Sequence, residues 1–389
     1  MVNFTHSEAI NNTSIAIFTW GLAGDALSNI TAAISRGFWN LGVRNIYILY
    51  LKDNSGGKHN FPPGANLVHL GVKQTRWSMF PLAKFIKQVQ PDFFISLAFL
   101  NFSAIMGRML AGKVRTKLVI SQQHSLLYKA QVEHKGEFQA QAQLWLAQPL
   151  YQQVHGLVAT SKNILQEITT QVKVKLPPEH QIVIPNCVDI EAITAQAEIQ
   201  SNHPWLQNKQ QPVIVSVARL ATQKNFPLLL KALTIVRQKI DAKLMIWGEG
   251  YQRKNLEKLI AQLGLEAAVD LPGFVKNPWT HAAKGDLFVL PSEEEGFGLV
   301  LVEAMACELP VIATDAIGGG PREILEGGKH GILVPSNDVE SLAQAMIKVL
   351  KNSDLNQQLI AASKERCQDF QPEIVAQKWW DFLVQGNQD

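Results

Sequence analysis

The sequence contains few cysteines, and they lie far apart. Only three occur among 389 residues, at Cys187, Cys307 and Cys367, with no Cys-x-x-Cys pair and no histidine-rich spacing. This pattern argues against a disulfide scaffold and against a structural zinc site. It fits a reducing compartment, so we expect a cytoplasmic location.

Long apolar runs are also missing. The longest apolar window, residues 93–112, is interrupted by Asn101 and Arg108, whereas a membrane-spanning helix needs about 20 largely uninterrupted apolar residues. We expect a strand followed by a helix there. Residues 1–14 are polar and lack the charged-then-apolar pattern of a signal peptide.

Charge is nearly balanced but unevenly distributed. Residues 1–190 carry 17 basic and 9 acidic side chains, a net charge of +8, and residues 191–389 carry 19 and 24, a net charge of −5. The basic half could meet an anionic acceptor, or contact the inner face of a membrane peripherally, or simply be solvated. We expect no nucleic-acid partner. The basic residues singled out are Lys84, Lys87, Arg108, Lys113, Arg115 and Lys117.

Short apolar runs alternate with helical stretches along the whole chain. In the first half the runs are 15–18, 46–50, 67–70, 93–97, 118–120, 156–159 and 182–184. In the second half they are 213–217, 244–247, 269–271, 287–290, 311–313 and 332–334. Continuous apolar strands separated by helices predict an α/β protein with two Rossmann-like, doubly wound parallel sheets covered on both faces.

A polar stretch at residues 194–211 separates the two series of strands. We therefore predict a first domain at 1–195, a second at 196–370, and an amphipathic helix in 371–389 that packs back across the junction. Ligands of open α/β sheets bind beyond the carboxyl ends of the strands, so both domains can contribute to a cleft.

The most informative segment is Glu295-Gly-Phe-Gly-Leu-Val-Leu-Val-Glu303. Two carboxylates stand where a buried strand gives way to a helix, and Gly296 and Gly298 leave backbone N–H groups accessible. Amides at a helix N-terminus attract phosphate oxygens, and a carboxylate one turn into the helix can accept two hydrogen bonds from a vicinal diol. The segment predicts a site for a ribose followed by a diphosphate.

Two loops that follow strands of the second half add to this site. Arg219 and Lys224 are close enough in sequence to clamp a diphosphate, although basic loop residues are commonly surface decoration. Gly248 lets the backbone approach a ring, and main-chain groups near Phe274 and Val275 could read a base edge, or these segments could simply form turns.

Two loops of the first half follow strands in the same way. Gly21 and Gly24 form a plausible anion-facing turn before a helix that starts near Ala26. His124 places an imidazole beyond the run 118–120, and such a histidine can be structural as well as catalytic.

The chain resembles the retaining glycosyltransferase group 1 family, whose GT-B fold consists of two facing Rossmann-like domains. The resemblance covers nearly all of the second half, and the Glu-x7-Glu motif is its most specific part. The matching positions are Arg219, Lys224, 248–250, 272–274, 292–310 and 321–325. In the first half the matching positions are 21–24, His124, 158–161 and 183–189.

The resemblance implies a hexosyltransferase that moves a hexose or N-acetylhexosamine from a nucleoside diphosphate sugar to a hydroxyl acceptor: a glycan, a lipid-linked molecule or a small molecule. Residues 320–325 are similar to members that use UDP-N-acetylhexosamines, which favours a UDP-sugar. Glu303 would hold the ribose hydroxyls, Arg219 and Lys224 would neutralise the departing diphosphate, and His124 would lie by the hexose or the acceptor. The groups facing the donor sugar and its phosphates would be Glu295 and the amides of Gly296, Phe297, Gly298 and Leu299.

The first-domain loop departs from the family pattern, since Gly21-Leu-Ala-Gly-Asp25 replaces the common Gly-Gly-Ala-Glu-Arg type. This puts the acceptor-side phosphate contact in question. Ala218, where the family has glycine, is a milder change.

No Asp-x-Asp pair occurs to hold a divalent ion under the diphosphate. We therefore expect no metal or other cofactor, with Arg219 and Lys224 supplying positive charge and configuration retained without a covalent intermediate. Two alternatives remain: a non-hydrolysing nucleotide-sugar epimerase, and a catalytically silent nucleotide-sugar-binding protein.

Overall fold

The computed structural model describes residues 10–53, 55–133, 135–207 and 209–385. Contacts divide the chain into two compact units, the first comprising residues up to Val188 and from Gln371 onward, and the second comprising Asp189–Phe370. The division precedes the 195/196 boundary expected from the sequence. The reason is that α8 (Ile190–Glu198) packs on α12 (Trp279–Ala282) and α13 (Leu299–Ala306) of the second unit.

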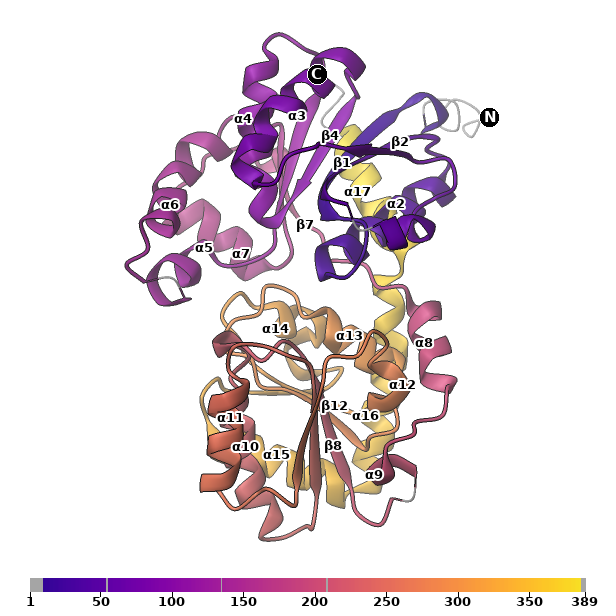
Figure 1. Ribbon diagram of the computed structural model, residues 1–389, viewed down its shortest axis with the longest axis vertical. Coiled ribbons are helices and arrows are strands. Elements are labelled where there is room, and N and C mark those ends of the chain that lie inside the picture. The colour runs from indigo at the N-terminus through magenta and orange to yellow at the C-terminus, as the bar shows by residue number, and fades with distance from the viewer. Residues whose placement is uncertain (1–9, 54, 134, 208, 386–389) are drawn as a thin grey trace. The chain divides into compact units, whose positions relative to one another are not determined.

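A seven-stranded parallel sheet forms the centre of the first unit (Figure 1). Its strand order is β3-β2-β1-β4-β5-β6-β7, so the sheet grows outward in both directions from the β1/β4 pair. The strands are β1 (Ser14–Gly21), β2 (Asn45–Lys52), β3 (Asn66–His69), β4 (Phe93–Leu97), β5 (Lys117–Gln122), β6 (Gly156–Ala159) and β7 (Gln181–Val183).

Helices connect these strands. They are α2 (Ala26–Leu41), α3 (Met79–Val89), α4 (Asn101–Ala111), α5 (Leu126–Tyr128), α6 (Phe138–Tyr151) and α7 (Lys162–Gln166). The start of α2 is fixed by Asp25, whose carboxylate accepts from the Ser28 N–H at 2.9 Å, and its end is fixed by Gly42 in the left-handed conformation. The connections after β5 and β6 also contain short π-helical turns, at Lys129–Glu133 and Glu167–Gln171.

The last described helix belongs to the first unit. Helix α17 (Pro372–Gln385) packs along α2, and in Figure 1 the yellow α17 lies beside the indigo α2. Gly37 permits this approach, because a Cβ there would lie 2.3 Å from the Pro372 carbonyl oxygen and 2.6 Å from the Ala376 Cβ.

The second unit contains a six-stranded parallel sheet of order β10-β9-β8-β11-β12-β13. Its strands are β8 (Val213–Val217), β9 (Lys243–Trp247), β10 (Val269–Gly273), β11 (Leu287–Leu290), β12 (Val311–Thr314) and β13 (Ile332–Val334). Its further helices are α9 (Pro204–Gln207), α10 (Phe226–Arg237), α11 (Arg253–Gln262), α14 (Gly320–Ile324), α15 (Val339–Lys351) and α16 (Ser353–Cys367). Each apolar run expected to form a strand lies within one or extends at most one residue past its carboxyl end, and the predicted α/β fold with two Rossmann-like units is confirmed.

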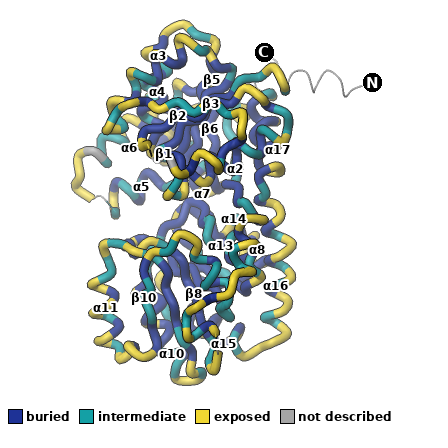
Figure 2. The backbone as a smooth tube through the Cα atoms, turned by 45° about the vertical axis from the view of Figure 1, so that its right-hand side comes forward, coloured by how far each residue is buried: buried dark blue, intermediate teal, exposed yellow. Residues whose placement is uncertain are grey.

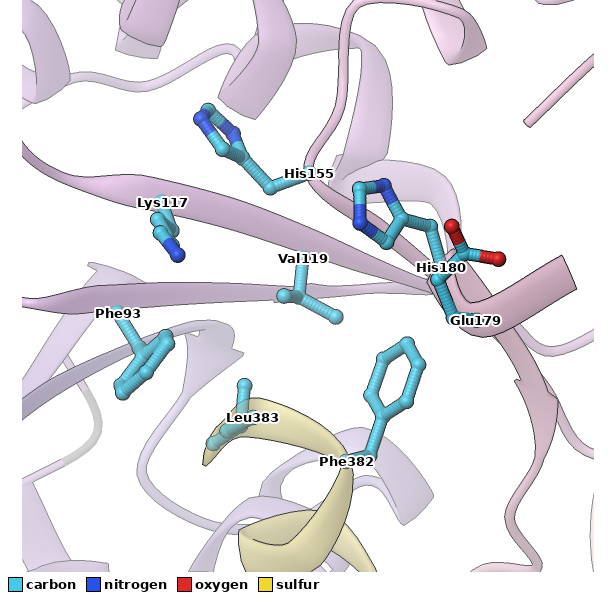
Figure 3. Close-up of a pocket in the computed structure, with 8 residues that line it drawn as sticks. All are labelled: Phe93, Lys117, Val119, His155, Glu179, His180, Phe382 and Leu383. Carbon is cyan, nitrogen blue, oxygen red and sulfur yellow. The ribbon is translucent and has the colours of Figure 1, made fainter. Parts of the chain in front are cut away.

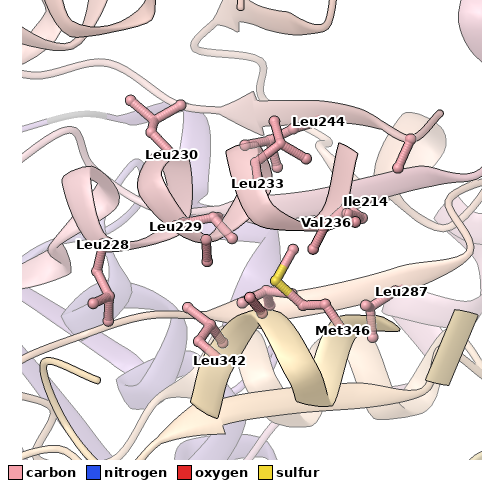
Figure 4. Packing of buried hydrophobic residues seen from close by; sticks show 14 of the residues in the cluster. Ile214, Leu228, Leu229, Leu230, Leu233, Val236, Leu244, Leu287, Leu342 and Met346 are labelled. Carbon is pink, nitrogen blue, oxygen red and sulfur yellow. The ribbon is translucent and has the colours of Figure 1, made fainter. Parts of the chain in front are cut away.

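Burial of the strands explains why they could be predicted from apolar runs in the sequence. Figure 2 shows the strands of both sheets as buried and the outer surfaces of the helices as exposed. In the second unit, α10 and α15 cover one face of the sheet with fully buried side chains such as Leu229, Leu233 and Met346 (Figure 4). Strands covered on both faces are apolar along their whole length rather than alternating.

A small pocket lies at the amino ends of the first unit's strands, away from the edge where the predicted site residues are. It is lined by Phe93, Lys117, Val119, His155, Glu179, His180, Phe382 and Leu383, the last two from α17 (Figure 3). The ring of His155 accepts a hydrogen bond at Nδ1 from the Leu118 N–H at 3.2 Å. Burial, helped by nearby Arg108, Lys117 and His180, lowers the pKa of His155 to about 4, so this imidazole is neutral at physiological pH.

Candidate functional site

The loop after β9 is joined through its main chain both to the loop after β8 and to the end of β10. The Leu220 N–H donates to the Glu249 carbonyl oxygen at 2.9 Å, and the Gly248 N–H donates to the Gly273 carbonyl oxygen at 2.9 Å. Gly248 has a φ of 144°, and a Cβ there would lie 2.0 Å from the Ala218 carbonyl oxygen. Glycine is required at this position, and the packing holds the exposed Arg219 at the carboxyl edge of the second sheet.

Lys224 and Glu295, predicted as catalytic, form an ion pair through Nζ and Oε2. The side chains are 18% and 8% exposed. The two segments that carry them are also joined through their main chains, because the Glu293 N–H donates to the Gln223 carbonyl oxygen at 2.8 Å. The turn after β8 and the loop after β11 thus bring a cation and a carboxylate together from 71 residues apart.

The Glu295–Gly298 loop is built against the loop that follows β12. The Glu295 N–H donates to the Ile317 carbonyl oxygen at 2.8 Å, and the Glu295 carbonyl oxygen accepts from the Gly320 N–H at 3.0 Å. A Cβ on Gly320 would lie 2.2 Å from the Phe297 carbonyl oxygen. Only glycine at 320 lets the two loops pack this closely.

The loop leads into the amino end of α13. Gly298 is the N-cap, with φ at 101°, and it provides no side-chain cap for the first turn, which starts at Leu299. Since the first amides of a helix attract anions, this end can hold phosphate oxygens. A Cβ on Gly298 would lie 3.2 Å from the Glu295 Cγ, so the same end adjoins the Lys224–Glu295 pair.

Phe297 contributes only its main chain to the exposed side of the Glu295–Gly298 loop. Its side chain is buried, 3% exposed, and its ring packs edge-on against Phe370 with centroids 5.6 Å apart. Gly296 precedes it in the same loop.

Glu303 lies on α13 and accepts a hydrogen bond from the Trp279 indole N–H at 2.8 Å. Desolvation raises the pKa of Glu303 to about 6, and the indole N–H opposes that rise. Trp279 is almost fully buried, 1% exposed. It was not predicted from the sequence, where no local pattern links it to a carboxylate 24 residues later.

Phe274 and Val275 follow β10 at the same edge of the second sheet. The Phe274 side chain is 71% exposed, an unusual state for a phenylalanine, and Val275 is partly buried. Gly273, with φ at 94°, turns the chain there.

The predicted residues of the first unit lie at the carboxyl edge of its own sheet. Gly21 ends β1, and its carbonyl oxygen accepts from the Ser28 hydroxyl at 2.9 Å, while Gly24 has φ at 88°. His124 follows β5, is partly exposed, and its carbonyl oxygen accepts from the Gln122 amide at 2.7 Å. These residues belong to two separate loops, one after β1 and one after β5, and β4 lies between those two strands in the sheet.

Metal-binding and membrane-spanning features are judged on residues 10–53, 55–133, 135–207 and 209–385. Those residues contain no group of three or more His, Cys, Asp or Glu side chains arranged to hold a metal ion. No described helix is long and apolar enough to cross a membrane. Within the described part of the chain, Cys187, Cys307 and Cys367 form no disulfide bond.

Known glycosyltransferases are similar to this chain in sequence. Residues 198–366 match the family described as glycosyl transferases group 1. A curated relative from Campylobacter jejuni is 31% identical over 286 residues, spanning 73% of each chain. It is named N-acetylgalactosamine-N,N'-diacetylbacillosaminyl-diphospho-undecaprenol 4-alpha-N-acetylgalactosaminyltransferase. The chain belongs to the glycosyl transferases group 1 family.

The solved structures agree on the fold of this glycosyltransferase. HepE from Anabaena, crystallised with UDP and glucose, is 21% identical, with a TM-score of 0.74 over 96% of this chain and 100% of that one. Sucrose-phosphate synthase from Thermosynechococcus elongatus is 18% identical, with a TM-score of 0.77 over 96% and 99%. The fold is GT-B, as predicted.

The family match covers one part of the predicted site. Residues 198–366 of this glycosyltransferase include every predicted residue of the second unit, from Arg219 to Glu303. They do not include Gly21, Gly24 or His124.

Proposed function

We propose that this glycosyltransferase moves a hexose or N-acetylhexosamine from a UDP-sugar to a hydroxyl acceptor, with retention of configuration and without a metal ion. The C. jejuni relative is named as an N-acetylgalactosaminyltransferase, and Anabaena HepE was crystallised with UDP and glucose. The first name supports an N-acetylhexosamine as the transferred sugar, and the second supports a uridine nucleotide in the donor. The lipid-linked acceptor in the first name supports an acceptor of that class.

One observation carries the donor assignment: the Lys224–Glu295 pair adjoins the uncapped amino end of α13. A diphosphate at this end would receive backbone amides from the helix and positive charge from Lys224 and Arg219. Glu303, further along α13, would accept hydrogen bonds from the ribose hydroxyls. Glu295 would hold the Lys224 ammonium in place before the donor binds.

The mechanism follows from where charge develops. As the bond from the sugar to the diphosphate breaks, negative charge accumulates on the phosphate oxygens, and fixed cations and amides stabilise it. The acceptor hydroxyl attacks from the face that the diphosphate leaves and gives its proton to the departing phosphate oxygen, and attack from this face retains the anomeric configuration. His124, Gly21 and Gly24 would serve the hexose and acceptor side, and Phe274 and Val275 the base.

The test removes the two cations. We expect Arg219→Ala combined with Lys224→Ala to reduce kcat by about 10²–10³, as loss of a transition-state donor does elsewhere. Lys231→Ala, an exposed lysine of α10, is the matched control and should leave kcat unchanged. A double variant whose kcat stays within about tenfold of the parent contradicts the assignment.

The same assay tests the other two features. Turnover should be unaffected by EDTA, and NMR of the product should show the anomeric configuration of the donor. An inverted product, or activity that returns only with a divalent ion, overturns that part of the proposal.

We also propose that the first unit touches an anionic membrane through an α3–α4 face. It is formed by side chains of α3, of α4 and of the turn that precedes α3: Trp77, Phe80, Lys84, Lys87, Met109 and Leu110. Residues 54–132 contain ten basic residues and one acidic residue. The four apolar side chains of this face are 43–53% exposed, and the rings of Trp77 and Phe80 stack with centroids 6.1 Å apart. A groove of about 490 Å³ between α3 and α4 is lined by Phe80, Leu110 and both lysines, among others.

Not every basic residue suggested by the sequence belongs to this face. Arg108 donates to the carbonyl oxygens of Gly112, Val114 and Thr116 at 2.8–3.1 Å, so it holds a loop. Lys117 is only partly exposed and lines the pocket at the amino edge.

Vesicle sedimentation tests whether the α3–α4 face binds an anionic membrane. Binding to phosphatidylglycerol vesicles should exceed binding to phosphatidylcholine vesicles, and Lys84→Ala with Lys87→Ala should weaken it about 30-fold, at about 1 kcal/mol per lysine. The control is Lys254→Ala with Lys258→Ala, two exposed lysines of α11. If both double variants lose vesicle binding equally, or if the protein binds both lipids equally, the proposed membrane contact is refuted.

A further inference from the structure

We infer that Glu167 is a positioning residue for His124. Glu167 is buried, with 8% of the residue exposed, and its carboxylate holds the segment that immediately follows the histidine. The inference rests on the proposed function, in which His124 lies by the transferred sugar or the acceptor.

Glu167 accepts hydrogen bonds from three successive residues. The Ser125 hydroxyl donates to Oε2 at 2.5 Å, and the Leu126 and Leu127 N–H groups donate to Oε1 at 2.8 and 3.3 Å. The same Ser125 hydroxyl oxygen accepts from the Tyr128 N–H at 2.9 Å. The carboxylate therefore fixes the backbone from the residue after His124 through the start of α5.

The hydrogen-bond pattern requires a carboxylate. Both oxygens of Glu167 act as acceptors, and the Ser125 hydroxyl gives its only proton to one of them while accepting from Tyr128. A glutamine would turn an N–H₂ group toward Ser125 or toward the Leu126 and Leu127 amides, so at least one donor would lose its acceptor. Glu167→Gln therefore loosens the segment at nearly constant side-chain volume.

Further buried hydrogen bonds hold the other side of His124. Gln122 donates to the His124 carbonyl oxygen and accepts from the fully buried Tyr151 hydroxyl at 2.8 Å. Gln123 donates to the Ser121 hydroxyl oxygen and accepts from the Asn186 amide at 2.6 Å. With the backbone held before and after it, His124 keeps one position relative to the carboxyl edge of the sheet.

The location of Glu167 agrees with this role. It is the first residue of the π-helical turn Glu167–Gln171, where the Val172 N–H donates to the Glu167 carbonyl oxygen. Such turns are rare and occur frequently at functional sites. Here the turn brings a residue from after β6 to the loop that follows the neighbouring strand, β5.

A double-mutant cycle tests whether Glu167 acts through His124. We expect Glu167→Gln to reduce kcat about 10- to 100-fold, because small displacements of a reacting group are costly, and to leave the Kd for UDP within about twofold. In the His124→Ala background the same substitution should change kcat by less than about twofold. Additive losses in the cycle would overturn the inference.

Asp92→Asn is the matched control. The Asp92 carboxylate also accepts from a backbone N–H and a serine hydroxyl, those of Ser14 at 2.8 and 2.7 Å, but at the amino edge of the sheet. The control should lose comparable stability and keep the parental kcat. If it loses kcat as Glu167→Gln does, the effect of Glu167 is one of stability alone and the inference fails.

A readout independent of activity separates this inference from the proposed function. In ¹³C-histidine NMR spectra, the imidazole signal that His124→Ala removes should move in Glu167→Gln and stay in place in Asp92→Asn. A signal that moves while His124→Ala retains kcat refutes the catalytic role of His124 but not the positioning. An unmoved signal refutes the positioning. Should Glu167→Gln fail to fold, Ser125→Ala removes a single donor to the same carboxylate and takes its place in each measurement.

Discussion

Replacing Glu303 by glutamine should change stability and nucleotide binding in opposite directions. The folded protein raises the pKa of this carboxyl from 4.5 to about 6, because desolvation outweighs the hydrogen bond from Trp279. At neutral pH the folded state therefore carries an ionised carboxylate in an unfavourable position. Glutamine has nearly the same shape and no charge.

The magnitude follows from the two pKa values. Below about pH 4.5 the carboxyl is neutral in both states, and its protonated form contributes its full stabilisation. Between the two values the folded state binds the proton more tightly than the unfolded state, so this stabilisation is lost as pH rises through about 6. The total loss is about 2 kcal/mol, an upper value because Glu303 is partly exposed.

Urea unfolding of parent and variant at pH 5 and pH 8 measures this change. The stability of Glu303→Gln relative to the parent should increase between the two pH values by about 1 kcal/mol or slightly more. Meanwhile its Kd for UDP at pH 8 should rise about 10- to 100-fold, since a hydrogen bond to a charged group is replaced by one to a neutral group. Glu266→Gln, an exposed carboxylate of the same unit, is the control for both. A variant that is relatively less stable at pH 8 than at pH 5, or that binds UDP as the parent does, refutes the reasoning.

Two further substitutions test the surroundings of the site. Trp279→Phe removes the donor that lowers the pKa of Glu303, so UDP binding should begin to weaken at a higher pH than in the parent; Trp205→Phe is the control, and an unchanged pH profile contradicts the contact. Gly320→Ala places a methyl group 2.2 Å from the Phe297 carbonyl oxygen and should lower kcat at least tenfold by moving the loop, whereas Gly56→Ala, with nothing within 4 Å, should be silent. A parental kcat for Gly320→Ala would show that the loop can shift without cost.

The fold was predictable because its strands are buried on both faces. Runs such as 213–217 and 287–290 consist almost entirely of apolar residues, and both form strands at the centre of the second sheet. Residues that directly follow parallel strands must lie at one edge, which is why the proximity of Lys224 and Glu295 could be anticipated. The domain boundary was harder to predict, since no pattern in the sequence around α8 indicates that this helix packs on α12 and α13.

The supports of the site could not be predicted. The contact of Trp279 with Glu303 and that of Glu167 with Ser125 join residues 24 and 42 positions apart. They depend on how loops from different strands meet, and a single sequence carries no signal for that. Nor does a motif reveal that the Phe297 ring turns into the core or that Arg108 is engaged with carbonyl oxygens. The roles of the site residues remain predictions for the experiments above.

The return of the chain to its first unit through α17 bears on how the protein is made. The second unit is continuous in sequence, so the ribosome completes it before it adds Gln371. Most of the first unit is synthesised first, yet its fold is completed last, because the face of α2 around Gly37 stays uncovered until α17 has emerged from the ribosome. This reverses the usual order, in which the N-terminal domain is the first to fold during synthesis.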